Sequence, residues 1–206
     1  VGATREEIDS VIRSYADAGV KHIVALRGDP PEGPGSQFRA HPGGYQTSTD
    51  LVAGIRKLGD FEVTVSAYPE KHFESPNLKY DIEMLKRKQD NGAHYAVTQM
   101  FFDNKKFFEF EAACRKAGIN VPIIPGLKPI TSKKQLSVIP RTFNVDIPTD
   151  LSNEILGCKT DTDVEKVGTE WLIAQSKELK AHKVPVLHYY TLGKPKVIYN
   201  VARELF

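Results

Sequence analysis

The sequence has 206 residues, 40% of them hydrophobic and 26% charged, which is enough for one well-filled core. Lys and Arg number 28 against 26 Asp and Glu, and the charges are mixed along the chain, which argues against the one-signed surface of a nucleic-acid-binding protein. No apolar run approaches the roughly 18 residues of a membrane-spanning helix and no secretory leader opens the sequence, so we predict a soluble protein without a membrane partner. The sequence has two cysteines without a CxxC pair, which favours a reducing, cytoplasmic location.

The predicted elements alternate between helix and strand along the chain. Thr4 and Glu7 form a capping box, and the apolar residues that follow recur at helical spacing. The β-rich runs cover residues 22–26, 62–67, 95–102, 121–124 and 186–192. Further helices are expected over residues 48–57, 78–91, 104–117, 162–181 and 195–205. Gly19, Gly92 and Gly118 each follow a predicted helix and indicate its end.

The strand-like runs are short and almost continuously apolar, which is typical of parallel strands covered on both faces. A doubly wound sheet and a closed barrel both fit such alternation. The residues from Gly33 to Phe38 do not form the GxGxxG signature of a nucleotide-binding sheet, so we predict a barrel, whose chemistry gathers at the carboxyl ends of its strands. The Pro- and Gly-rich stretch 30–44 is then expected to be an active-site loop.

Polar residues follow several of these runs, and each also has a purely structural interpretation. Asp29 after the first run is either a functional carboxylate or a loop cap, and the lone histidines are more often structural than functional. Gln99 lies within an apolar run, where an unpaired amide costs about 1–3 kcal/mol. A contact between Gln99 and a buried ligand therefore has the same weight as a structural role. Lys86–Lys88 fits a solvated helix face, and Lys128 raises the alternative of a Schiff-base barrel aldolase.

Metal chemistry has no support in the sequence. Cys114 and Cys158 do not form a CxxC pair, and the six histidines show no HxxxH or HExxH spacing. We therefore predict neither a disulfide framework nor a metal site.

Five segments in order resemble the bacterial type of the methylenetetrahydrofolate reductase family: HIVALRGDPP, VSAYPEKH, DIEMLKRKQDNGAHYAVTQMFFD, IIPGLKPI and LHYYTLGK. The resemblance implies an α/β fold, a (β/α)8 TIM barrel of which this chain supplies about strands 4 to 8 and their helices. Residues 1–206 would form a single, partial, flavin-binding catalytic domain, homo-oligomeric by analogy. The implied reaction is reduction of 5,10-methylenetetrahydrofolate to 5-methyltetrahydrofolate with NADH or NADPH, by ping-pong hydride transfer through bound FAD.

The resemblance also implies roles for individual residues. Asp29 and Gln99 match catalytic positions, and Asp29, Gln99 and Lys194 match positions that bind the folate. The remaining correspondence is with positions that hold the flavin: Arg27, Gly28, Asp29, Tyr45, Ala67, Tyr68, His72, Asp81, Arg87 and Lys88. The basic pair 87–88 would suit the flavin pyrophosphate, which replaces the solvated-face interpretation.

This sequence departs from the family at its general acid and, at two weaker points, at residues 131–133, where relatives often have an aromatic residue, and at Lys194, where an arginine is common. The family's general acid is a glutamate after the first barrel strand, and strands one to three have no counterpart in these 206 residues. The alternative function is therefore a noncatalytic fragment of the enzyme, with the aldolase as a further alternative.

Overall fold

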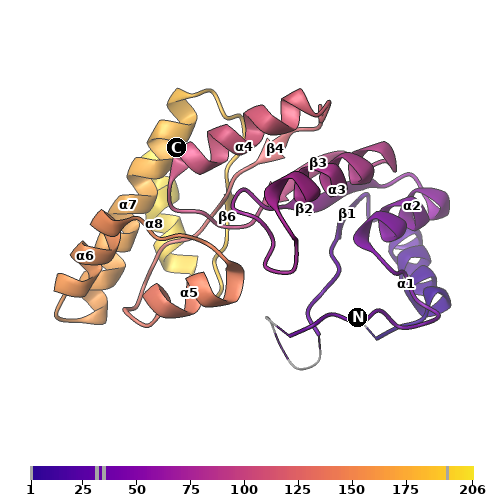
Figure 1. The fold of residues 1–206 in the computed structure, drawn as a ribbon, viewed down its shortest axis with the longest axis horizontal. Coiled ribbons are helices and arrows are strands. Elements are labelled where there is room, and N and C mark those ends of the chain that lie inside the picture. The colour runs from indigo at the N-terminus through magenta and orange to yellow at the C-terminus, as the bar shows by residue number, and fades with distance from the viewer. Residues whose placement is uncertain (1, 31–32, 34–35, 194) are drawn as a thin grey trace. The chain divides into compact units, whose positions relative to one another are not determined.

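The computed structural model describes residues 2–30, 33, 36–193 and 195–206 (Figure 1). The chain packs into two compact units, which are described separately. The first comprises Val1–Tyr68, Phe73–Val97 and Ala113–Ile123, and the second comprises Pro69–His72, Thr98–Ala112 and Ile124–Phe206. The expectation of a single domain over 1–206 stays a prediction.

The first unit is built on a sheet whose strands follow the chain order β1-β2-β3-β4. Its elements are α1 (Arg5–Asp17), β1 (His22–Ala25), α2 (Ser48–Leu58), β2 (Glu62–Ala67), α3 (Leu78–Asp90) and most of β3 (Tyr95–Thr98). The C-terminal end of α4 (Asn104–Lys116) and the first residue of β4 (Ile123–Ile124) also belong to it. β1 and β2 pair in parallel, with Ala25 opposite Val65. A doubly wound sheet reverses its strand order part-way, whereas a barrel adds each strand beside the previous one, so this order is that of a barrel section.

Local sequence signals set the helix ends of this unit as expected. The Thr4–Glu7 capping box is present, with the Glu7 N–H donating to the Thr4 hydroxyl at 3.2 Å and the Thr4 N–H donating to the Glu7 carboxylate at 2.8 Å. Gly19, Gly92 and Gly118 all have positive φ, of 80°, 102° and 76°. Glycine adopts this conformation without a Cβ clash, so these predicted helix ends are confirmed.

The expectation that every strand is covered on both faces is wrong for β1. Val24 is 62% exposed, and Leu26 just beyond the strand is 54% exposed. On α1, Val11 and Tyr15 are exposed as well, although they belong to the predicted apolar face. β1 lies at the edge of the four-stranded sheet, where no described strand pairs with its outer side. The helical periodicity therefore predicted which residues form the apolar face of α1, but it did not predict that Val11 and Tyr15 are exposed.

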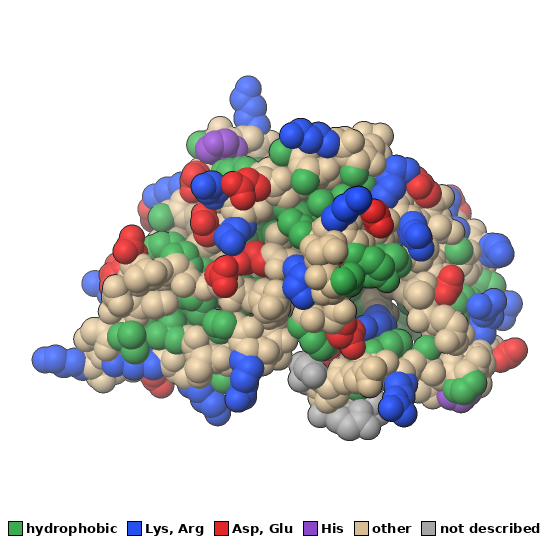
Figure 2. Space-filling model, in the orientation of Figure 1, with side chains coloured by type: hydrophobic (Ala, Val, Ile, Leu, Met, Phe, Trp, Pro, Cys, Tyr) green, Lys and Arg blue, Asp and Glu red, His purple; other side chains and the backbone are tan. Residues whose placement is uncertain are grey.

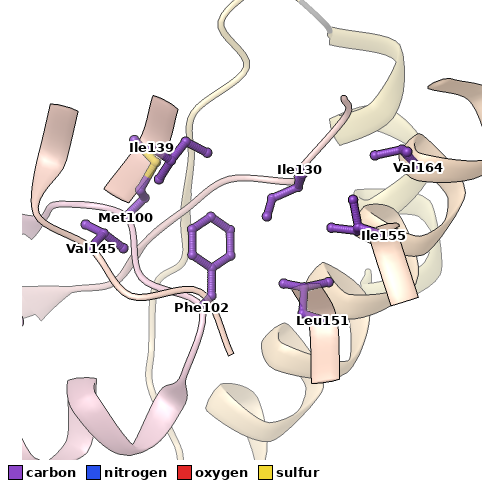
Figure 3. Close-up of a cluster of buried hydrophobic side chains, with 8 residues drawn as sticks. All are labelled: Met100, Phe102, Ile130, Ile139, Val145, Leu151, Ile155 and Val164. Carbon is purple, nitrogen blue, oxygen red and sulfur yellow. The ribbon is translucent and has the colours of Figure 1, made fainter. Parts of the chain in front are cut away.

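The second unit combines a two-stranded parallel ladder with a helical layer. β5 (Gly126–Leu127) pairs with β6 (His188–Tyr189). The helices wholly in this unit are α5 (Gln135–Phe143), α6 (Thr149–Gly157), α7 (Asp161–Ala181) and α8 (Pro195–Leu205). Eight buried side chains form one core cluster in the unit, drawn in Figure 3: Met100, Phe102, Ile130, Ile139, Val145, Leu151, Ile155 and Val164.

The second unit holds most of the differences from the sequence prediction. The run 95–102 is strand only to Thr98, and Phe102 at its far end packs into the core cluster instead. α5 and α6 were not predicted, because each is only nine residues long and prolines, Pro140 within α5 and Pro148 before α6, interrupt the helical pattern. Gly126 and Leu127, which lie just beyond the predicted run 121–124, form the short strand β5.

Charged side chains of both signs are interspersed over the face of the molecule drawn in Figure 2, which agrees with the near-zero net charge. Within the part of the chain that the structure describes, no helix has both the length and the apolar composition needed to cross a membrane.

Gly168 in α7 provides a test of the packing in the second unit. A Cβ at this position would lie 1.9 Å from the carbonyl oxygen of Ile130. Gly168→Ala is therefore expected to destabilise the chain by about 1–3 kcal/mol in urea unfolding, despite the higher helix propensity of alanine.

Gly157→Ala is the matched control, since Gly157 also lies in a helix and a Cβ there would meet nothing within 4 Å. We expect this variant to unfold at the same urea concentration as the parent or at a slightly higher one. Equal stability of the two variants would contradict the close packing of α7 against Ile130.

Candidate functional site

The carboxyl ends of β1 and β2 bring charged side chains together in the first unit. Arg27 lies two residues beyond β1, and Tyr68 directly follows β2, which pairs with β1 in parallel. The Tyr68 hydroxyl donates a hydrogen bond to Ser66 Oγ at 3.2 Å. Burial raises the pKa of the Tyr68 phenol, an effect opposed by the Ser66 hydrogen bond and by the positive charge of Arg27, so Tyr68 is neutral at physiological pH.

Lys88 of α3 reaches the carboxyl end of β2. Only 6% of the residue is exposed, and its Nζ donates to the Ser66 carbonyl oxygen at 3.0 Å and to Ser66 Oγ at 3.4 Å. Burial lowers the pKa of Lys88 to about 8, the Asp81 carboxylate opposes this shift, and Arg27 adds to it. Arg27 and Lys88 are thus two cations near one strand end, and the Asp81 carboxylate offsets part of the charge on Lys88.

Asp81 lies seven residues before Lys88 on α3 and is also buried. Its Oδ1 accepts a hydrogen bond from Ser75 Oγ at 2.5 Å. Arg87, next to Lys88, is exposed. Successive helix residues point about 100° apart, so the predicted basic pair is divided between the interior and the solvent.

Side chains after β1 and after β2 hold the Arg27 guanidinium in place. It pairs with the Glu74 carboxylate and lies 4.3 Å from the centre of the Phe38 ring. Glu74 also accepts a hydrogen bond from the Phe38 N–H at 3.0 Å. The predicted active-site loop is thus attached to the strand end through one arginine, and Arg27 and Phe38 line a small cavity of about 60 Å³.

Tyr45 lines the same small cavity but directs its hydroxyl to α1. Its Oη donates to Asp9 Oδ1 at 2.6 Å, and Arg5 lies 4.6 Å from the centre of its ring. Burial, reinforced by the hydrogen bond to Asp9, raises the pKa of Tyr45 to about 12. The phenol is therefore a neutral, fixed wall of the cavity.

The other predicted residues of the first unit show a range of exposures. Gly28 has φ 79°, a conformation that glycine adopts without strain and that turns the chain directly after Arg27. Asp29 is exposed, and its charge raises the pKa of Tyr68 slightly. Ala67 is the buried last residue of β2.

Of the remaining predicted residues, His72 and Gln99 belong to the second unit. His72 is half-buried, and its carbonyl oxygen accepts a hydrogen bond from Lys71 Nζ at 3.1 Å. Gln99 was expected inside a strand but lies just beyond β3, half-buried, where its Oε1 accepts the Met100 N–H at 3.0 Å. Lys194 lies outside the described residues.

Comparison with known proteins assigns the family. The family model described as methylenetetrahydrofolate reductase matches residues 1–205. The chain is 38% identical over all 206 residues to the 5,10-methylenetetrahydrofolate reductase of Salmonella typhimurium and 37% identical to that of Escherichia coli, covering 67% of each relative. The chain belongs to the methylenetetrahydrofolate reductase family.

One solved structure with low sequence identity shares the fold. An uncharacterized protein from Clostridium thermocellum, described as binding two copies of 5-methyl-5,6,7,8-tetrahydrofolic acid, aligns with a TM-score of 0.61 at 16% identity. The alignment covers 99% of this chain and 69% of that chain. At this identity the likeness concerns the fold, and it agrees with the α/β barrel section expected from the sequence.

Membership of this reductase family confirms the predicted class of enzyme and gives the aldolase alternative no support. Lys128, the residue on which that alternative depended, is only 8% exposed and donates to the Pro129 carbonyl oxygen at 3.1 Å.

Several residues of the described site carried no specific sequence signal. Ser66 and Glu74 hold Lys88 and Arg27 in place, but an isolated serine in a strand and an isolated glutamate in a loop are unremarkable in sequence. Glu70 follows the predicted strand 62–67, where a single glutamate carries no specific signal. In the second unit its side chain is 7% exposed, 3.1 Å from the Asp146 N–H and 3.9 Å from Lys106 Nζ.

Glu70 should make stability depend on pH. Burial raises the pKa of its carboxyl from 4.5 to about 7, and the hydrogen bond from Asp146 opposes that shift. Between these two pH values the folded chain binds a proton that the unfolded chain has released, so this contribution to stability is complete below pH 4.5 and is lost as pH rises towards 7.

We expect Glu70→Gln to remove this contribution. The difference in unfolding free energy between parent and variant, from urea titrations at pH 5, 6, 7 and 8, should fall with pH by at most about 1.4 kcal/mol per pH unit. Glu109→Gln, an exposed acid of α4 paired with Lys105, is the control and should leave the slope unchanged. Parallel pH profiles for parent and Glu70→Gln would contradict the raised pKa.

Proposed function

We propose that this chain carries flavin- and folate-binding residues of an enzyme that reduces 5,10-methylenetetrahydrofolate to 5-methyltetrahydrofolate with NADH or NADPH and bound FAD. The family assignment and the names of the relatives support the reaction. The observation that carries the proposal is the buried Lys88 beside Arg27 at the strand ends of the first unit. A homo-oligomer in the cytoplasm belongs to the same proposal and rests on the family resemblance.

The residues present fit the charge of FAD. Lys88 is a desolvated ammonium whose described partners include the Ser66 carbonyl and hydroxyl oxygens, and Arg27 adds a second positive charge. A pyrophosphate beside these groups would stabilise the charged form of Lys88 and remove the conflict between two neighbouring cations. Arg27, Gly28, Tyr45, Ala67, Tyr68, His72, Asp81, Arg87 and Lys88 are the residues that we propose hold the flavin, together with Asp29.

When bound, FAD supplies the hydride chemistry, and the residues of this chain orient the reactants and set the local charge. Asp29 presents an exposed carboxylate after β1. In our proposal it accepts hydrogen bonds from the amino and ring N–H groups of the pterin. The negative charge of Asp29 would also disfavour the negative charge that a flavin gains on reduction, and so would lower the reduction potential of a flavin beside it.

Gln99 and Lys194 are proposed to contact the folate. Because Gln99 Oε1 already accepts the Met100 N–H, its Nε2 is the end of the amide that can donate to an acceptor atom of the pterin. Lys194 would supply a cation for a carboxylate of the folate tail.

The test of the flavin site is retention of FAD by the purified chain. The parent should be yellow and should show NADH-to-menadione oxidoreductase activity. Lys88→Gln should weaken FAD binding by at least about tenfold, whereas Arg87→Gln, at an exposed position on the same helix, should have a smaller effect.

Equal effects of the two substitutions would contradict the special role of the buried lysine. A folded, colourless parent that does not bind added FAD would support the alternative that these 206 residues are a noncatalytic fragment. Far-UV circular dichroism of both variants separates loss of the site from loss of the fold.

Asp29→Asn and Gln99→Ala should separate the two half-reactions. Asp29→Asn is expected to retain FAD and to slow folate reduction by roughly tenfold or more, about 1.4 kcal/mol in activation free energy. Gln99→Ala should raise the KM for folate more than it changes nicotinamide oxidation. Stopped-flow measurement of each half-reaction checks both, and equal losses in the two half-reactions would contradict contacts specific to the folate.

A further inference from the structure

The connection between β2 and α3 contains a turn at Glu70 and Lys71 that packs with the second unit. Pro69–His72 belong to this unit, although Tyr68 before them and Phe73 after them belong to the first. Lys71 has φ 81°, in the left-handed region that residues other than glycine seldom adopt. Such a conformation persists only where surrounding groups hold it.

One side chain, that of Asn144, binds both carbonyl groups of this turn. Its Nδ2 donates to the Glu70 carbonyl oxygen at 3.1 Å and to the Lys71 carbonyl oxygen at 3.2 Å. An amide nitrogen carries two hydrogens and can serve both acceptors. These carbonyls belong to the two peptide groups that flank the Lys71 Cα, so the contact restrains both φ and ψ of Lys71.

Asn144 is itself fixed at the end of α5. It is the C-terminal cap of that helix, with φ 54° and ψ 50°, and its N–H donates to the Pro140 carbonyl oxygen at 2.9 Å. Asparagine is one of the few residues besides glycine that adopt this conformation readily. The next residue, Val145, is 3% exposed and belongs to the core cluster of the unit (Figure 3). Asn144 therefore reaches the turn from a well-packed segment.

A second contact joins the same turn to the segment after α5. The Asp146 N–H donates to Glu70 Oε2 at 3.1 Å, and the Glu70 side chain is 7% exposed. Lys106 Nζ lies 3.9 Å from Glu70 Oε2 and 3.4 Å from Asp146 Oδ2, so this lysine bridges the two carboxylates. Residues 144–146 thus hold the turn by its backbone and by its buried side chain.

We propose that Asn144 is a positioning residue for His72, and this inference rests on the proposed function, in which His72 helps to hold the flavin. Lys71 turns the chain directly before His72, so the φ and ψ of Lys71 decide the direction in which His72 leaves the turn. Lys71 Nζ also donates to the His72 carbonyl oxygen at 3.1 Å. Among the described residues, the Asn144 side chain hydrogen-bonds to Glu70 and Lys71, neither of which is a proposed flavin residue, so it acts on His72 through the turn.

The effect on flavin binding can be measured with a glycine substitution. Asn144→Gly removes both hydrogen bonds, while glycine keeps the left-handed end of α5. In the full 206-residue chain it should weaken FAD binding by about threefold to tenfold, measured by titration of flavin fluorescence. Lys183→Gly is the matched control, because Lys183 is exposed, has φ 62° and also follows a helix of the second unit, α7. It should bind FAD as the parent does.

A double-mutant cycle separates positioning of His72 from a general structural role. If Asn144 acts through His72, Asn144→Gly should weaken FAD binding little further in a His72→Gln background, and the two effects are not additive. A general loss of stability would instead weaken binding by the same factor in both backgrounds.

The surroundings of His72 can also be followed without flavin. The His72 side-chain signal in a proton–nitrogen correlation NMR spectrum is assigned by its absence in His72→Gln. It should shift in Asn144→Gly and stay in place in Lys183→Gly. A parent chain that binds no FAD contradicts the proposed function, and the NMR comparison then still decides whether Asn144 positions His72.

An unchanged His72 signal in the folded Asn144→Gly variant would overturn the inference. Where the parent binds FAD, unchanged FAD affinity of that variant or an additive cycle would overturn it as well. Far-UV circular dichroism shows whether each variant folds. Asn144→Asp keeps the shape of the side chain and loses its donors, so its His72 signal decides the question if Asn144→Gly does not fold.

Discussion

The burial of one ammonium group, that of Lys88, is the constraint on which the candidate site depends. A lysine with 6% of its surface exposed has lost most of its hydration, and it recovers part of that free energy through hydrogen bonds to Ser66 at the end of β2. The same contact ties α3 to the sheet. Burial leaves the charge poorly hydrated despite these hydrogen bonds, so the pKa of Lys88 falls, and an anion at the strand end would raise it again.

The segment that follows β1 contributes the second cation of the candidate site. Arg27 is held by an ion pair with Glu74 and by the ring of Phe38, so its guanidinium is fixed before any ligand arrives. Fixing a long, flexible side chain in advance lowers the entropy that binding must remove. In our proposal this strand end, with one buried and one restrained cation, meets the pyrophosphate of the flavin.

In the second unit, the hydrogen bonds of several buried polar side chains are only partly satisfied. Glu70 is shielded and remains close to Lys106 and the Asp146 N–H, so its carboxyl changes protonation near neutral pH. Asn104 and Gln175 use their amide hydrogens within the chain, and no described residue donates a hydrogen bond to their side-chain oxygens. In each case side chains and backbone from distant segments decide which polar atoms are satisfied.

The sequence by itself determined the α/β alternation, the helix that the Thr4 capping box begins, the helix ends at Gly19, Gly92 and Gly118, and the family. These are local signals, or ordered motifs that need no knowledge of packing. Only the tertiary structure decided that Lys88 is buried while Arg87 is exposed, that Gln99 lies beyond the end of β3, and that the edge strand β1 leaves Val24 exposed. Burial depends on which distant segments cover a side chain, and the periodicity of a single element does not contain that information.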